Sequence, residues 1–361
     1  MNQTWEEQER VFRTISERYQ GSFTQKVFRY RHPACLQSRA PERFRTPYEV
    51  DVRYLQWGRP DQPLLLCLGG VANVAHRFDE LALALKSEYQ VACMDWVGRG
   101  DSGWLHSEGD YHLETYIEQT RQFLDQFDSR SATVLGSSMG GSVAIALAAQ
   151  LPGRIDRLIL NDTGPSFLAE RRVKRAETLS RYYIFRSPQD VVRKIGASQK
   201  NDGPITPEMR IYLAYHQSEW SDREGGRIYR HDMRAMQAYQ RDAAAGLDQW
   251  KEWSTISCPV LLIHGEESDV LDLDTVNRML HKHDVSLFSV PATGHTPMLV
   301  DAWHIREIRG WLQATSSPCL YGDVLTADVK GEAQSPTRLI ERHAGEVAPG
   351  WKVAEMFPHG Q

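Results

Sequence analysis

The chain has 361 residues and a net charge of −5, with 41% hydrophobic and 25% charged residues. These values are typical of an ordinary globular protein, and they give no case for nucleic acid or an anionic membrane as the main partner. No apolar run is long enough to span a membrane, and residues 1–7 lack the basic and apolar segments of a secretory signal. The five cysteines form no spaced framework, so we expect a reducing, cytoplasmic location.

Residues 1–45 are expected to form an N-terminal helical extension. The spacing of four apolar residues indicates one face of an amphipathic helix that ends near Gly21: Trp5, Phe12, Ile15 and Tyr19. The sequence leaves open whether this helix packs on the main domain or on a second subunit. Two short strands are then expected at 48–52 and 53–57, before a turn that begins at Gly58.

From residue 64 onward, short apolar runs alternate with helical patterns. Runs that are apolar throughout indicate strands buried on both faces, and we expect such strands at 64–68, 90–94, 132–135, 157–160, 259–263 and 285–290. Helices are expected between them at 78–86, 113–127 and 141–149, and after the last strand at 303–312. Regular alternation of this kind predicts an α/β fold with a mostly parallel, eight-stranded sheet flanked by helices.

The alternation is interrupted between two of these strands. Residues 164–256 show no apolar strand and are rich in arginine and aromatic side chains, so we interpret them as an inserted helical cap. The predicted organisation is therefore a core in two parts, 46–163 and 257–314, separated by the cap. Residues 315–361 are polar, contain scattered proline and glycine, and predict a tail that is flexible or loosely docked.

One pentapeptide, Gly136-Ser137-Ser138-Met139-Gly140, lies at the join between a predicted strand and a helix. A Gly-x-Ser-x-Gly turn in this position holds its serine at the apex of a tight bend, at the positive end of a helix. Gly136 and Gly140 lack side chains, so the strand and the helix can pass close together. The pattern predicts that Ser138 is a nucleophile.

A serine nucleophile needs a base, which accepts its proton, and an acid, which orients that base. His295, in Gly294-His295-Thr296 after the last strand, is the preferred base, and His264 at the end of another strand is the alternative. Asp269 is the preferred acid, because the chain order Ser138, Asp269, His295 is the order of nucleophile, acid and histidine that this type of site uses. Nearby Glu267 and Asp272, and Asp162 after an earlier strand, are further candidates for the acid.

Acyl transfer also requires donors for the developing oxyanion. We expect them to be the backbone N–H groups of Met139, directly after the serine, and of Val71, after Gly69-Gly70. The run 95–102, Asp-Trp-Val-Gly-Arg-Gly-Asp-Ser, lacks the glycine spacing of a dinucleotide site. It is interpreted as a structural turn that shapes the pocket wall beneath the cap.

Together these motifs resemble those of the α/β-hydrolase superfamily, over about residues 48–312. Residues 68–71 are similar to its oxyanion turn, 95–102 to its Asp-x-x-Gly-x-Gly-x-Ser loop, 136–140 to its nucleophile elbow and 294–295 to its histidine loop. A serine at the elbow argues against the epoxide hydrolases and haloalkane dehalogenases, because the pattern of those enzymes has an aspartate at this position. One departure concerns the acid, because Asp269 falls one residue later after Gly265 than in the commonest version.

The resemblance implies a serine hydrolase that cleaves a small or medium carboxylic ester through an acyl-enzyme intermediate. It implies no metal and no organic cofactor, and its only expected partner is a small-molecule substrate, with oligomeric state undefined. Carbon–carbon bond hydrolysis or acyl transfer on the same residues is an alternative, although Thr296 stands where carbon–carbon hydrolases often carry tryptophan. A ligand receptor that keeps these residues but turns over little is a third interpretation.

Overall fold

The structure is a computed structural model that describes residues 3–33, 46–167, 169–196, 201, 203–282, 284–314 and 338–339. The expectations for residues 34–45 and for nearly all of the tail 315–361 lie outside the described residues. None of the helices within the described ranges is both long and apolar enough to cross a bilayer.

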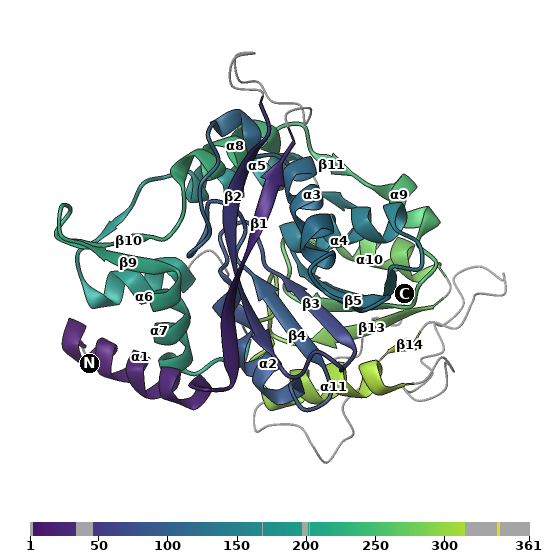
Figure 1. Ribbon diagram of the computed structural model, residues 1–361, viewed down its shortest axis with the longest axis horizontal. Coiled ribbons are helices and arrows are strands. Elements are labelled where there is room, and N and C mark those ends of the chain that lie inside the picture. Colours follow the sequence, from purple (N-terminus) through teal and green to yellow (C-terminus); the bar gives the residue numbers. More distant parts are fainter. Residues whose placement is uncertain are drawn as a thin grey trace, which may run out of the picture.

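A nine-stranded sheet forms the centre of the fold, in the order β1-β2-β4-β3-β5-β6-β12-β13-β14 (Figure 1). The pairs from β4 to β14 are parallel, whereas β2 is antiparallel to both β1 and β4. The predicted mostly parallel α/β sheet is therefore confirmed; eight of its strands precede the tail. The strands are β1 (Phe23–His32), β2 (Tyr48–Trp57), β3 (Leu64–Leu68), β4 (Gln90–Met94), β5 (Ala132–Ser137), β6 (Ile155–Asn161), β12 (Val260–Gly265), β13 (Val285–Val290) and β14 (Arg338–Leu339).

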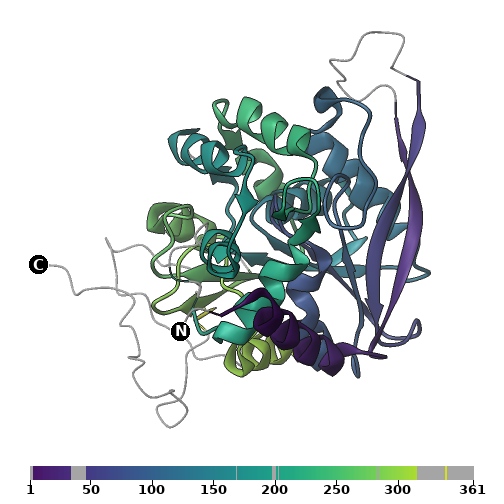
Figure 2. The same ribbon diagram turned by 90° about the vertical axis from the view of Figure 1, so that its left-hand side faces the viewer.

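Strands β1 and β2 differ from the sequence prediction. Residues 48–57 form one continuous strand, because no turn residue separates Val52 from Arg53, and the expected division into two strands is wrong. Its partner β1 pairs with it over its whole length, from Phe23 opposite Trp57 to His32 opposite Tyr48. The first half of β1 is largely exposed, so it lacks the alternation that reveals a strand in a sequence. Figure 2 shows this long pair at the edge of the molecule.

Side chains of each inner strand point alternately into two separate cores. Leu64, Leu66 and Leu68 pack into one core, while Leu65 and Cys67 pack into the other. The first core is covered by α3, α4, α9 and α10, and the second by α2 and α11. These helices are α2 (Asp79–Leu85), α3 (Leu113–Leu124), α4 (Met139–Gln150), α9 (Trp250–Thr255), α10 (Leu273–Leu280) and α11 (Ala302–Gln313).

The segment between β6 and β12 is mostly helical, as its composition indicates, but it also contains two small sheets. One sheet has the order β8-β10-β9, and the other pairs β11 with β7. Strands of two to four residues are too short to produce a detectable period, which explains why no pattern in the sequence predicted them. The elements are β7 (Ser166–Phe167), α5 (Ala169–Leu179), β8 (Ile184–Phe185), α6 (Pro188–Gly196), α7 (Pro207–His216), β9 (Ser218–Ser221), β10 (Gly226–Tyr229), α8 (Met233–Ala243) and β11 (Leu247–Asp248).

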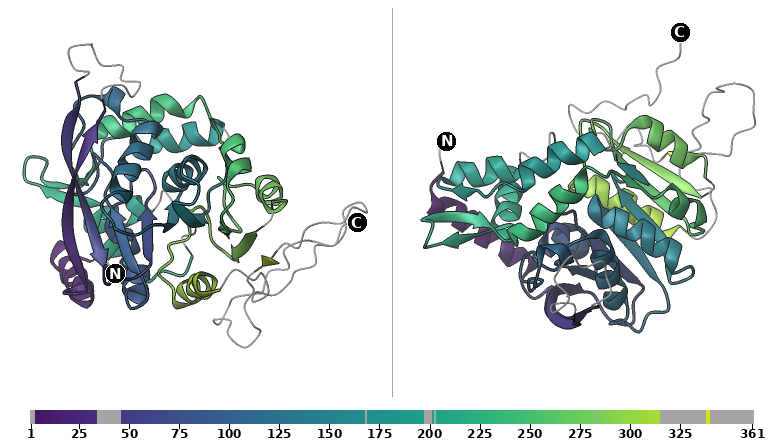
Figure 3. Two further views of the ribbon diagram at one scale, coloured as in Figure 1. Left: turned by 45° about the vertical axis from the view of Figure 1, so that its right-hand side comes forward. Right: turned by 90° about the horizontal axis from the view of Figure 1, so that it is seen from above.

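The N-terminal helix α1 (Trp5–Tyr19) packs against α7 of this inserted segment (Figures 1 and 3). Thr4 caps it in a capping box with Glu7. The ring of Phe12 stacks on Tyr212 and Tyr215, at centroid distances of 5.8 and 5.4 Å. The apolar face predicted for this helix thus packs against the same chain, with Ile15 and Tyr19 buried.

Candidate active site

Ser138 lies in a tight turn between β5 and α4. Its backbone has φ 52° and ψ −118°. This conformation is energetically unfavourable for any residue other than glycine. The flanking glycines are required, since a Cβ on Gly136 would lie 2.4 Å from the Gly140 carbonyl oxygen. A Cβ on Gly140 would lie 2.3 Å from the carbonyl oxygen of Leu68. Strand and helix therefore meet as the Gly-x-Ser-x-Gly pattern predicts, with Ser138 at the apex.

His295 follows β13 and faces Ser138. Its Nε2 lies 3.1 Å from Ser138 Oγ, so the ring can accept a hydrogen bond from the hydroxyl. The loop that carries His295 is fixed by the buried Arg77, whose Nη2 donates to the carbonyl of Thr296 at 2.9 Å. Asn161 adds a second link, because its amide donates to Ser137 Oγ and to the carbonyl of Pro297.

The carboxylate beside His295 is that of Asp162. Its Oδ2 lies 2.7 Å from His295 Nδ1, the ring nitrogen that faces away from Ser138. The side chain is fully buried, and three further donors hold it: the N–H of Gly265, the hydroxyl of Ser268 and the N–H of Thr296. A buried carboxylate with four donors is satisfied as an anion.

Asp269, the acid preferred from the sequence, does not occupy this position, and the expected placement is corrected to Asp162. Asp269 is exposed, and its backbone carbonyl accepts a hydrogen bond from Arg171. The loop after β12 sends Ser268 inward instead, and its hydroxyl donates to Asp162 at 2.6 Å. Hence this loop supports the carboxylate of the neighbouring strand rather than supplying one.

His264, Asp272 and Glu267 each make contacts away from Ser138. Nε2 of the buried His264 lies 3.0 Å from the carbonyl oxygen of Leu271, which holds the loop after β12. Asp272 caps α10 by accepting from the N–H of Thr275. Glu267 is exposed and accepts from the side chain of Asn201. The structure therefore brings together Ser138 and His295, as predicted, with Asp162 as the carboxylate.

The environment of His295 favours a neutral ring. Burial lowers the pKa of His295, and the positive charge of Arg175 lowers this pKa further, against the opposing effect of Asp162. A histidine that is neutral near pH 7 can accept a proton from a neighbouring hydroxyl. Asp162 can then stabilise the imidazolium that forms.

The turn after β3 lies directly against Ser138. A Cβ on Gly70 would be in ordinary contact with the Ser138 Cβ, at 3.5 Å, and only 2.8 Å from Asn73 Oδ1, so it is Asn73 that leaves no room for a side chain here. The buried Arg99 holds the turn, since its Nε donates to the carbonyl of Val71 at 2.8 Å. Trp96 Nε1 donates to the carbonyl of Gly69 at 2.9 Å. The loop 95–102 thus has a structural role, which it plays by supporting the turn that carries Val71; its predicted part in the pocket wall stays a prediction.

A cavity of about 320 Å³ opens above Ser138 and His295. Val71 and Met139 also line it, close to these two side chains. The inserted segment supplies the opposite wall, in which Arg171, Arg172, Arg175, Tyr239 and Arg241 take part. The candidate site is therefore enclosed between the sheet and the segment 164–256.

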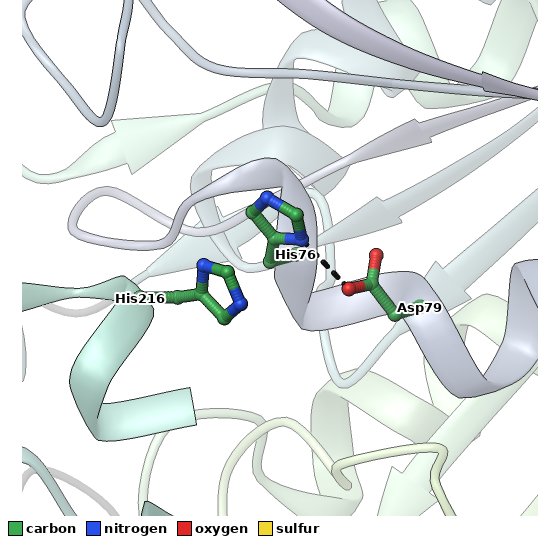
Figure 4. A group of neighbouring side chains, drawn as sticks. All are labelled: His76, Asp79 and His216. Atoms are coloured by element: carbon green, nitrogen blue, oxygen red, sulfur yellow. Dashed lines mark hydrogen bonds and ion pairs between the residues drawn. The ribbon is translucent and has the colours of Figure 1, made fainter. Parts of the chain in front are cut away.

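A separate group of side chains that could hold a metal lies between α2 and α7: His76, Asp79 and His216 (Figure 4). The two imidazole rings stack with centroids 3.6 Å apart, and His76 Nδ1 lies 2.7 Å from Asp79 Oδ2. The ligand atoms that these three side chains could offer all lie within 4.8 Å of one another, and Asp79 Oδ2 already faces His76 Nδ1. The group thus forms a stack between the core and the inserted segment, and the expectation of no metal stays a prediction.

The stack has an uneven distribution of charge. Burial opposes a charged His76, but the Asp79 carboxylate outweighs it and the pKa of His76 is raised. Burial lowers the pKa of His216, and the neighbouring His76 lowers it further. The hydroxyl of Tyr212 donates to the same Asp79 oxygen that His76 faces. The pKa values of the two stacked rings are thus shifted in opposite directions, which opposes simultaneous charging of both rings.

Sequence reasoning missed several residues that support the site. Asn161, Arg77 and Ser268 carry no motif, because each acts through a hydrogen bond between segments far apart in the chain. Arg175 is one of many arginines in a helical pattern, and only the fold shows that it lines the same cavity as His295. The position of Asp162, directly after a fully apolar strand, was the one available signal for the acid.

Comparison with known proteins agrees with this architecture. Residues 63–302 match the family model described as the alpha/beta hydrolase fold. The chain is 30% identical over 264 residues to a 3-hydroxybutyrate-oligomer hydrolase of Cupriavidus necator, covering 69% of this chain and 88% of that protein. It is 28% identical to an esterase of Mycobacterium tuberculosis, covering 67% of this chain and 79% of that one.

A solved alpha/beta hydrolase from Novosphingobium aromaticivorans superposes with a TM-score of 0.68 and 24% identity, covering 81% of this chain and 98% of that structure. At this identity the likeness concerns the fold. The family match covers well over half of the chain, in the region that contains the whole site. The chain therefore belongs to the α/β-hydrolase family, and it is a hydrolytic enzyme.

Proposed function

We propose that the protein is a serine ester hydrolase in which Ser138 is the nucleophile, His295 the general base and Asp162 the orienting acid. One observation carries this proposal: the His295 ring lies between the Ser138 hydroxyl and the Asp162 carboxylate, within hydrogen-bonding distance of both. Base and nucleophile in contact, with the base oriented by a third group, is the geometry of nucleophilic acyl transfer.

The proposed reaction has two halves. Ser138 Oγ attacks the ester carbonyl carbon while His295 Nε2 accepts the hydroxyl proton, and Asp162 stabilises the resulting imidazolium. The N–H groups of Val71 and Met139 stabilise the oxyanion, which then collapses and expels the alcohol, protonated by His295. Water, deprotonated by His295, attacks the acyl-enzyme, releases the acid and restores the hydroxyl.

The substrate is proposed to be a small or medium carboxylic ester. Two of the similar proteins are named as an esterase and as a hydrolase of 3-hydroxybutyrate oligomers, and an oligomer of a hydroxy acid is joined by ester bonds. The cavity of about 320 Å³ suits a compact substrate. We propose that the segment 164–256 acts as a cap that sets substrate choice, because it supplies the wall opposite Ser138.

The test is labelling by a fluorophosphonate together with hydrolysis of 4-nitrophenyl butyrate. Wild-type protein should be labelled on the peptide that contains Ser138, and Ser138→Ala should lose both labelling and turnover. Ser142→Ala is the matched control, because it removes another hydroxyl from the same cavity and should keep the label. Absence of labelling and of turnover in the wild type would refute the proposal, and an acyl-transfer product in place of free acid would favour a transferase.

A further inference from the structure

Two histidines and one aspartate meet where the inserted segment rests on the core. His76 lies in the short 3₁₀ helix Ala75–Phe78 and Asp79 begins α2, whereas His216 ends α7 of the inserted segment. One possible ligand atom from each side chain lies within 4.8 Å of the other two. None of the three residues lines the cavity above Ser138. The group is therefore separate from the candidate active site.

Two buried polar atoms of this group lack a hydrogen bond. Among the described residues, His216 Nε2 and Asp79 Oδ1 have no hydrogen-bond partner. Figure 4 shows one edge of the His216 ring directed toward His76 and Asp79. A buried polar atom without a partner is costly, and in a native protein it calls for an explanation such as a bound ion. A cation held among these side chains would give His216 Nε2 the partner that it lacks.

The donor set suits a divalent transition metal. Imidazole nitrogens and a carboxylate oxygen are ligands of zinc, at about 2.0–2.2 Å from the ion, whereas calcium and magnesium take oxygen ligands. Three protein ligands leave the fourth position of a tetrahedral ion to water. The His76 side chain is 20% exposed, which gives an ion and its water a path from solvent.

An ion can enter this group where a proton now lies. His76 Nδ1 and Asp79 Oδ2 are 2.7 Å apart and share one hydrogen bond. A metal replaces the shared proton, so the two atoms separate slightly and both become ligands. The stacked His216 ring must then turn its Nε2 toward the same ion, which ends its face-to-face contact with His76.

The surroundings already restrict the three ligands. The hydroxyl of Tyr212 donates to Asp79 Oδ2, and hydrogen bonds of this kind orient a carboxylate that binds a metal. The rings of Phe12 and Tyr212 meet His216 edge-on, at centroid distances of 5.0 and 4.5 Å. Packing thus keeps the possible ligands close together before any ion binds.

We propose that His76, Asp79 and His216 form a binding site for a divalent transition-metal ion, zinc in the first place, that ties the inserted segment to the core. The expectation of no metal applies to the reaction at Ser138, in which this ion takes no part. Because the ligands come together only in the folded chain, a bound ion should stabilise the fold.

The test is a zinc titration of the full, chelator-treated chain by calorimetry, together with thermal unfolding. Wild type should bind zinc at this site, and zinc at about 100 times its Kd should raise the unfolding midpoint by about 3–5 °C. Calcium and magnesium should give no shift, because two of the ligands are nitrogens. Absence of saturable binding up to millimolar zinc, or an equal response to calcium, would overturn the site.

Two variants locate the binding. His216→Phe keeps a ring in the stack but removes the ligand nitrogen, so zinc should bind more than about 100-fold more weakly and the midpoint should no longer rise. Tyr212→Phe removes only the hydroxyl that orients Asp79 and should weaken binding about 10- to 100-fold. The unfolding midpoint without zinc shows that each variant is folded.

Two matched controls remove a histidine elsewhere. His281→Gln changes an exposed residue, and His295→Ala removes the proposed base, and both should bind zinc as the wild type does. Zinc binding of wild-type strength in folded His216→Phe would show that the ion binds at another place. Loss of binding in His295→Ala would place the ion at the candidate active site, and either result would refute the proposal.

Discussion

Ser138 and Asp162 leave neighbouring parallel strands at the same level. The residues before them, Ser137 and Asn161, are register partners in β5 and β6, and both following residues have φ 52°. The two chains thus bend at the same edge of the sheet and present a hydroxyl and a carboxylate side by side. His295, from the loop after β13, bridges them.

This arrangement predicts which carboxylate matters for turnover. Asp162→Asn should lower kcat about 10⁴-fold, because an amide no longer stabilises the imidazolium and favours the wrong ring tautomer. Asp269→Asn should change kcat less than about threefold, because that side chain is exposed. The measurement is steady-state hydrolysis of 4-nitrophenyl butyrate. A comparable loss in both variants, or a larger one at position 269, would return the role to Asp269.

The pH dependence of kcat/KM should follow the His295 ring. The proposed base acts in its neutral form, so activity should rise with pH through the pKa of His295 in the free enzyme. Burial and Arg175 lower this pKa, and the midpoint should therefore fall below the ordinary value of about 6.5.

Removing the nearby positive charge should move that midpoint in a known direction. Arg175→Met should raise it, measured on the neutral 4-nitrophenyl butyrate so that substrate charge plays no part. Lys174→Met serves as control and should leave the midpoint in place, since its side chain is exposed to solvent. A midpoint that stays put or moves downward in Arg175→Met would show that the two groups do not interact.

The sequence predicted the centre of the fold well, because its strands are apolar on both faces and leave few alternatives. It also predicted that Ser138 and His295 meet. Ser138 lies between two glycines that the tight turn requires, and His295 follows the last predicted strand. It favoured Asp269 over Asp162 as the acid, and that preference was wrong, because both aspartates follow strands that end at the same edge and the chain order does not separate them. Only the inward turn of Ser268, which binds Asp162, distinguishes them.

The missed elements share a physical cause. Strand β1 is stabilised by pairing along β2 rather than by a pattern of its own, and half of it is exposed. The cap strands are too short for periodicity. The role of Arg175 depends on which way α5 faces, and a helix rich in charge does not encode that direction locally. Long-range packing supplied each of these features.

The elbow should tolerate no side chain at Gly140. Gly140→Ala places a methyl group 2.3 Å from the Leu68 carbonyl oxygen, so strand and helix must separate. We expect the free energy of unfolding to fall by about 1–3 kcal/mol, and labelling of Ser138 by fluorophosphonate to slow at least about tenfold. Urea denaturation and labelling kinetics measure the two effects.

The control for this change is Gly225→Ala. Gly225 has φ +63° but open space around it, so only backbone strain of about 1–2 kcal/mol is expected, with labelling unchanged. If Gly140→Ala were labelled at the wild-type rate, the close contact between β3 and α4 would not be needed to position Ser138.

His231 should make the protein sensitive to acid. It is buried, its ring stacks on Tyr229 at 4.9 Å, and its Nε2 has no hydrogen-bond partner among the described residues. Burial, and to a smaller extent the charge of Arg99, lower the pKa of His231 to about 3, against the opposing charge of Asp232. In the unfolded chain the pKa is about 6.5. Between these values the unfolded state binds the extra proton, so folding stability is present above pH 6.5 and is lost as pH falls.

His231→Phe should therefore flatten the dependence of unfolding free energy on pH. Protonation of His231 in the unfolded chain should lower the wild-type free energy of unfolding by on the order of 2 kcal/mol between pH 7 and pH 5. The difference in unfolding free energy between wild type and variant should change by that amount over this range. Urea denaturation at several pH values gives the slope, which is independent of any constant packing effect of the new ring. His281→Gln, at an exposed position, should leave the slope unchanged. His216 and His295, whose pKa values are also lowered, should contribute to the slope that remains. An unaltered slope in His231→Phe would contradict the prediction. It would mean that the His231 ring is already protonated in the folded protein or becomes exposed before it titrates.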